Sequence, residues 1–148
     1  MTADLMHIRK MGALVSMLVT LNAQALDTAE LMNELSWKKR VVLVFAPGSQ
    51  DSGLQQQEAE LATDRAGMSE RDMTVIRVLA DGGMSVDGVR HDDTAASYYQ
   101  RFGIHRDEFK VVLVGKDGGV KLERDSPVTT TELFSLIDSM PMRRDEMQ

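Results

Sequence analysis

Two short runs of apolar, largely β-branched residues constrain the fold of this chain more than any other feature. The first, RVVLVFA, covers residues 40–46, and the second, MTVIRVLA, covers residues 73–80. Runs of this length without polar alternation are typical of strands that are buried on both faces, in a sheet covered by helices. Residues 53–66, which lie between them, repeat apolar side chains at helical spacing. The pattern therefore predicts a β–α–β unit with a parallel strand pair.

Capping and turn signals predict the elements around this unit. Capping signals predict helices over residues 27–37, 92–102 and 129–140, of which the second ends at Gly103 and the third at Pro141. The runs FKVVLV (109–114) and GVKLER (119–124) flank the turn signal Asp117-Gly118. Such a turn between two strands predicts an antiparallel hairpin. Helix, β–α–β, helix, hairpin and helix therefore follow one another along the chain.

Composition limits both the architecture and the chemistry. With 148 residues, of which 43% are apolar and 27% charged, the sequence predicts one globular domain over residues 26–148 with a short polar C-terminal tail. A net charge of −6 argues against nucleic acid as a partner, because phosphate binding needs a basic face. The chain has no cysteine, which excludes disulfides, thiolate metal sites and thiol redox catalysis.

The N-terminal residues have the pattern of a secretory signal. The basic stretch HIRK precedes an apolar run at residues 11–21, and the small residues AQA follow at 23–25. This run is shorter than the roughly 20 residues of a membrane span but suits the apolar part of a signal peptide. We expect residues 1–25 to be removed by cleavage after Ala25, leaving a periplasmic or secreted domain without a stable membrane span. An uncleaved N-terminal helix is the alternative, and either Met1 or Met6 can be the start.

The order of elements resembles the thioredoxin fold, and RFGIHRDEFKVVLVGKDGGVKL looks like the segment that leads into its two closing strands. The strings LSWKKRVVLVFAP, SERDMTVI, VVLVGKDGGVKL and LIDSMPMRRDEM resemble an uncharacterised family of exported bacterial domains. That family is related to the peroxiredoxin-like domain of vertebrate extracellular sushi-repeat and coiled-coil-domain proteins. The resemblance covers most of residues 26–140. It implies a three-layer α/β thioredoxin-like fold with a mixed central sheet.

The chain departs from active thioredoxins at two positions. GSQDSG stands where the cysteine pair would lie, and the place before VVLV that usually holds a cis-proline is near Lys110. Disulfide exchange is therefore excluded. At the start of the following helix, Asp51 or Ser52 can act as an N-cap. The alternative is a small anion or carbonyl site that the backbone amides form with Ser49 and Ser52.

Two functions follow from this loop. The first is a non-catalytic binding module of the cell envelope, which recognises an envelope protein or a small ligand. The residues predicted to form its binding loop are Pro47, Ser49, Gln50, Asp51, Ser52 and Lys110. The alternative is an enzyme that acts on a small molecule with Ser49, Asp51 and Lys110. A purely structural envelope protein is a third possibility. We predict no cofactor.

Several other residues each have a structural and a functional interpretation. Arg143 and Arg144 form either a solvated helix end or a patch for a carboxylate or phosphate partner. Met140, Met142 and Met147 are packing residues or ligands of copper(I). The HDD triplet at 91–93 caps a helix or binds a metal, and we expect the cap and no metal site.

Trp37 precedes Lys38, Lys39 and Arg40, at the entry to the first predicted strand. A tryptophan at the entry to a strand is most often part of the core or covers a sheet edge, which is the interpretation that we favour. The alternative is an exposed anchor for a partner.

Overall fold

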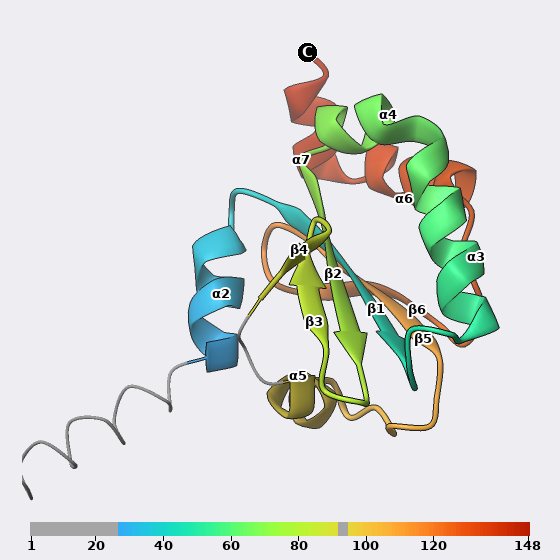
Figure 1. Cartoon of the computed structure of the whole chain (residues 1–148). Coiled ribbons are helices and arrows are strands. Elements are labelled where there is room, and N and C mark those ends of the chain that lie inside the picture. Colours follow the sequence, from blue (N-terminus) through green and yellow to red (C-terminus); the bar gives the residue numbers. More distant parts are fainter. Residues whose placement is uncertain (1–26, 92–94) are drawn as a thin grey trace, which may run out of the picture.

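A computed structural model describes residues 27–91 and 95–148 (Figure 1). The predicted signal peptide and the predicted caps Asp92 and Asp93 lie outside these residues. The predicted class is confirmed: helices cover a six-stranded sheet in which parallel and antiparallel pairs are mixed.

The sheet has the strand order β4-β3-β2-β1-β5-β6. The strands are β1 (Arg40–Ala46), β2 (Met73–Leu79), β3 (Met84–Val86), β4 (Val89–Arg90), β5 (Lys110–Val114) and β6 (Val120–Arg124). The two apolar runs pair in parallel as β1 and β2, as predicted. The predicted hairpin forms from β5 and β6, and β5 pairs antiparallel with β1. β1 therefore lies in the interior of the sheet.

Helices cover both faces of this sheet (Figure 1). One layer contains α3 (Ser52–Leu61), η1 (Ala62–Asp64), α4 (Arg65–Glu70), α6 (Thr130–Asp138) and α7 (Pro141–Glu146). The other contains α2 (Asp27–Leu35) and α5 (Ala95–Phe102). Val42 and Val44 of β1 pack into the first layer, while Leu43 and Phe45 pack into the second. All of β1 is thereby removed from water, and its buried valine, leucine and phenylalanine side chains each contribute about 1.5–3 kcal/mol.

Local capping explains where the helices begin and break. Thr129 Oγ accepts a hydrogen bond from the Glu132 amide at 3.1 Å, which confirms the predicted start of the last long helix. The helix predicted over 53–66 is instead divided into two. The Asp64 side chain caps α4 by accepting from the Gly67 amide at 2.8 Å. A Cβ on Gly67 would lie 2.7 Å from the Phe134 ring, so only glycine lets α4 approach α6 this closely.

A second hairpin, β3–β4, extends the sheet beyond the elements that we predicted from the sequence. Its turn residues Asp87 and Gly88 both have positive φ, 48° and 81°, which is typical of a tight Asp-Gly hairpin turn. Asp87 also completes the edge of β2, because its carboxylate accepts from the Val75 amide at 2.8 Å and its own amide donates to the Val75 carbonyl.

The C-terminal residues form a helix where a polar tail was expected. Pro141 occupies the first turn of α7, which suits a residue that has no backbone N–H to pair.

α7 brings the Glu146 carboxylate to the Arg40 guanidinium, with both N–O distances at 3.2 Å. Arg40 is 1% exposed, and it also donates to the Arg71 carbonyl at 2.9 Å. Lys116 joins the cluster through Glu146 at 2.6 Å and Asp72 at 2.9 Å. We call this cluster of Arg40, Asp72, Lys116 and Glu146 the Arg40 lock.

Glu146→Ala should lower the free energy of unfolding by about 2–3 kcal/mol, because it leaves the Arg40 guanidinium buried without a carboxylate. Urea denaturation followed by circular dichroism measures this change. Asp145→Ala, which removes a neighbouring exposed carboxylate, is the matched control and should change stability by less than about 0.5 kcal/mol. Equal effects of the two variants would contradict the role of Glu146.

Stability should also fall at acid pH. Burial raises the pKa of Glu146, but hydrogen bonds from Lys116 and Arg40 outweigh it and hold the pKa below its ordinary value. A hydrogen bond from Arg71, against the opposing effect of burial, lowers the pKa of Asp138. Both carboxylates therefore stabilise the fold fully above the unfolded pKa, about 4, and lose this contribution as pH falls through their lower folded values. Urea midpoints measured from pH 7 to pH 3 should decline below about pH 4, and less steeply for Glu146→Gln.

Candidate functional site

The loop after β1 has the backbone layout that the sequence predicted, and its acid acts as a cap. Asp51 precedes the first residue of α3, and its Oδ2 accepts from the Leu54 amide at 3.0 Å. This confirms the N-cap interpretation. Ser49, Gln50 and Ser52 are exposed and Pro47 is half-buried. The helix N-terminus is thus neutralised by the chain's own carboxylate, since a cap and an incoming anion compete for the same amides.

Lys110 lies on the opposite face of the sheet from α3. Side chains alternate along β5, and Val112 packs into the core under α2 and α5, so Lys110 projects to that side as well. Its Nζ is 2.9 Å from Asp125 and 3.7 Å from Glu123. The hydrogen bond to Asp125 raises the pKa of Lys110 above its ordinary value, which keeps the ammonium protonated. Lys110 is therefore not brought together with Ser49 and Asp51.

A buried tyrosine lies beneath the same end of β1. The Tyr99 hydroxyl donates to the Ala46 carbonyl at 3.0 Å and lies 3.3 Å from the Val78 carbonyl oxygen. Burial raises the pKa of Tyr99 to about 12, so the phenol stays protonated at neutral pH. Its role here is to join the ends of β1 and β2 below the loop.

The two C-terminal arginines do not form a joint patch. Arg143 is 4% exposed and its guanidinium pairs with Glu70 at 2.9 Å and Asp138 at 3.2 Å. Arg144 is exposed. The predicted partner patch of Arg143 and Arg144 is therefore corrected: α7 turns Arg143 into the protein, where it holds α7 against α4 and α6.

The remaining sequence candidates separate in the same way. Met140 packs against the core as predicted, whereas Met142 and Met147 are exposed. Among the described residues, no group of three or more histidine, aspartate and glutamate side chains is arranged to hold a metal ion. Trp37 is 67% exposed, so its favoured assignment to the core or a sheet edge is wrong. Its φ of 65° turns the chain after α2, and its amide donates to the Lys116 carbonyl at 2.7 Å.

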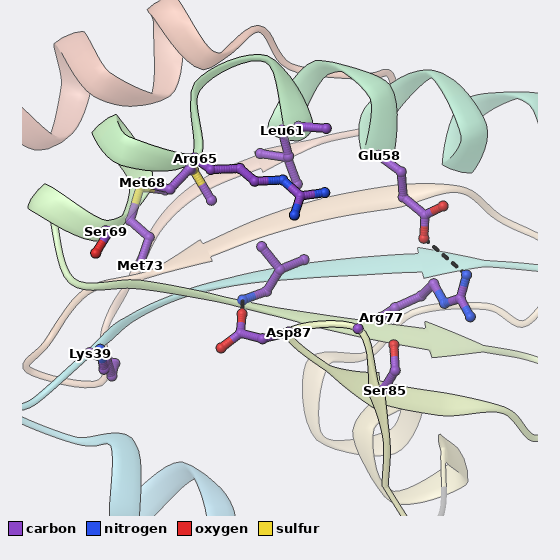
Figure 2. Close-up of a pocket in the computed structure, with 13 residues that line it drawn as sticks. Lys39, Glu58, Leu61, Arg65, Met68, Ser69, Met73, Arg77, Ser85 and Asp87 are labelled. Carbon is purple, nitrogen blue, oxygen red and sulfur yellow. Dashed lines mark hydrogen bonds and ion pairs between the residues drawn. The ribbon is translucent and has the colours of Figure 1, made fainter.

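A pocket of about 600 Å³ lies between the α3–α4 segment and the β2–β3 side of the sheet (Figure 2). Sequence reasoning missed this pocket because it had not predicted the β3–β4 hairpin that forms one wall. The lining residues are Lys39, Glu58, Leu61, Ala62, Arg65, Met68, Ser69, Met73, Val75, Arg77, Ser85, Asp87 and Gly88. The volume falls in the range of small-molecule sites. We define this concavity as the α4 pocket.

Charge in the α4 pocket is unevenly paired. Arg77 forms an ion pair with Glu58 at 3.0 Å, and the Asp87 carboxylate is bound to the Val75 amide. Within residues 27–91 and 95–148, no acidic side chain pairs with Lys39 or Arg65. Figure 2 shows the Arg65 side chain extending from α4 over the sheet, towards the side where Glu58 and Arg77 lie. Lys39 lies beside Met73, away from the Arg65 guanidinium, so the pocket carries positive charge at two separate places (Figure 2).

Comparison with solved structures places this architecture in a known class. The chain is similar to thioredoxin peroxidase I of Plasmodium yoelii, with a TM-score of 0.58 and 15% identity over 76% of this chain and 79% of that one. It is also similar to a thioredoxin-fold protein from Helicobacter pylori, with a TM-score of 0.50 and 12% identity over 68% of each chain. The fold is that of the thioredoxin and peroxiredoxin class, here without a cysteine. Among the described residues, no helix is long and apolar enough to cross a membrane.

Within this class, the chain belongs to the family described as "Domain of unknown function (DUF4174)", whose model matches residues 31–146. It is similar to coiled-coil domain-containing protein 80 of Danio rerio, with 26% identity over 78% of this chain and 15% of that protein. It is also similar to the human sushi repeat-containing protein SRPX2, with 24% identity over 86% of this chain and 28% of that protein. The chain thus spans less than a third of the length of these relatives.

Asp51→Ala should lower the free energy of unfolding by about 1 kcal/mol, because it removes the acceptor that caps α3. Urea denaturation measures this change. Ser52→Ala is the matched control, since Ser52 is exposed and not the cap, and it should be nearly neutral. A stability change within about 0.3 kcal/mol for Asp51→Ala would show that the cap has little energetic weight.

Proposed function

We propose that the chain is an exported, non-catalytic binding module of the cell envelope. The observation that carries the proposal is the position of Asp51. At the helix start where thioredoxin-like proteins carry a reactive cysteine, this chain places a carboxylate that its own backbone binds. The α4 pocket, in contrast, has two cations, Lys39 and Arg65, with which no acidic side chain of the described residues pairs. Recognition is therefore favoured over chemistry.

The enzymatic alternative needs groups that converge on one point. Ser49 is exposed, Asp51 is engaged as a cap, and Lys110 is protonated on the other face of the sheet. A nucleophile without a base in hydrogen-bond reach stays weak. This arrangement favours a module that binds its ligand unchanged.

Export rests on the sequence alone. The order of basic stretch, short apolar run and small residues at 1–25 is typical of a signal peptide. The resemblance to exported bacterial domains agrees with that pattern. We infer that the domain acts in the periplasm or outside the cell.

Photo-crosslinking in living bacterial cells tests this proposal. A photoreactive residue replaces Ser69, which lines the α4 pocket and is exposed, or Gln50 in the loop after β1. The protein is then recovered by cell fractionation and its intact mass is measured. We expect to recover the chain from the cell envelope, without residues 1–25 and with a reproducible adduct at position 69. Asp145, exposed on α7, is the control position and should give no adduct.

Two results would contradict the proposal. Recovery from the cytoplasm with residues 1–25 retained would refute export. Conversion of a compound in an envelope extract by the purified chain, abolished by Ser49→Ala, would refute the non-catalytic role.

A further inference from the structure

The α4 pocket combines an apolar floor with a charged rim. Leu61, Met68 and Met73 are 7%, 8% and 7% exposed, and all three line the pocket. Methionine side chains are flexible and polarizable, so they adapt to ligands of different shape. This floor suits the hydrocarbon part of a ligand, since covering apolar surface is favourable by about 25 cal/mol per Å².

The rim selects the charge of the ligand. Lys39 and Arg65 carry positive charge into the pocket, and the acids beside them are already engaged: Glu58 by Arg77 and Asp87 by the Val75 amide. The chain as a whole has a net charge of −6, so the positive charge of Lys39 and Arg65 is opposite in sign to that of the chain. A guanidinium binds a carboxylate through two parallel hydrogen bonds, with an ammonium adding a point charge.

We propose that the α4 pocket binds a small organic carboxylate with an apolar tail. Arg65 binds the carboxylate, Lys39 adds positive charge at the end of the pocket beside Met73 (Figure 2), and the tail lies on Leu61, Met68 and Met73. The volume of about 600 Å³ accommodates a medium-chain acid. This inference rests on the proposed function, because it names the ligand class of the same pocket.

Methionine methyl resonances make the test site-specific. Octanoate is titrated into the purified chain labelled at its methionine methyl groups, and chemical shifts are followed by NMR. Met68 and Met73 line the pocket, whereas Met32 and Met84 lie in the core on the other face of the sheet. We expect the first pair to shift on titration and the second pair to stay unchanged. Octanol and butanoate should each bind at least about tenfold more weakly, because each lacks one half of the recognition.

Charge variants connect the binding to the rim. Arg65→Gln should raise the octanoate dissociation constant at least about fivefold, and Lys39→Gln should raise it by a smaller factor. Arg144→Gln is the matched control, since Arg144 is exposed on α7 and outside the pocket. It should bind like the unmodified chain. Unchanged methyl spectra without ligand confirm that each variant is folded.

Three outcomes would overturn the inference: shifts at methionines outside the pocket, equal affinities of Arg65→Gln and Arg144→Gln, or displacement of octanoate by an equal concentration of inorganic phosphate. None of these outcomes contradicts the proposed function, which is tested separately by the adduct at position 69 and by the export of the chain. An adduct at that position without octanoate binding would leave a binding module whose ligand is of another class.

Discussion

The buried guanidinium of Arg40 is the constraint on which the arrangement of this protein depends. It stands at the start of β1, 1% exposed, in an otherwise apolar strand. A buried cation must be paired, because an uncompensated charge is costly to remove from water. Glu146 on α7, the Arg71 carbonyl before β2, and Lys116 in the β5–β6 turn all meet at this point. The charge thus fixes the relative positions of three segments that lie far apart in the sequence.

The rest of the C-terminal helix follows the same logic. Arg143 pairs with Glu70 and Asp138, and Asp138 in turn accepts from Arg71 at 2.8 Å. These contacts hold α7 across the ends of α4 and α6. The ion pairs also explain why a segment as polar as PMRRDE is ordered against the protein. Its charges face partners on neighbouring elements as well as solvent.

The sequence was sufficient to predict the layers and failed where tertiary contacts decide. Continuous apolar runs and capping boxes identified β1, β2, the β5–β6 hairpin and α6, because those signals are local. The Asp87-Gly88 turn carried a hairpin signal of its own, yet its strands are too short for periodicity to show. α7 and Arg143 were mispredicted because their partners lie elsewhere in the chain. The cap at Asp51 was predictable from its position before the helix. The α4 pocket was not, because it forms where the helix break at Asp64 meets β3, and no local sequence pattern shows that these two segments come together.

The separation of 106 residues between Arg40 and Glu146 bears on how the protein is made. During synthesis β1 leaves the ribosome long before α7 exists, and until then its arginine has no carboxylate from that helix. Native structure that depends on so distant a contact forms late, because a long loop must close first. The ion pairs of the Arg40 lock therefore cannot all form until residue 146 has been synthesised. For a domain that is exported, as we propose, such a delay keeps the domain from folding completely, and so competent for transport, until residue 146 has been made.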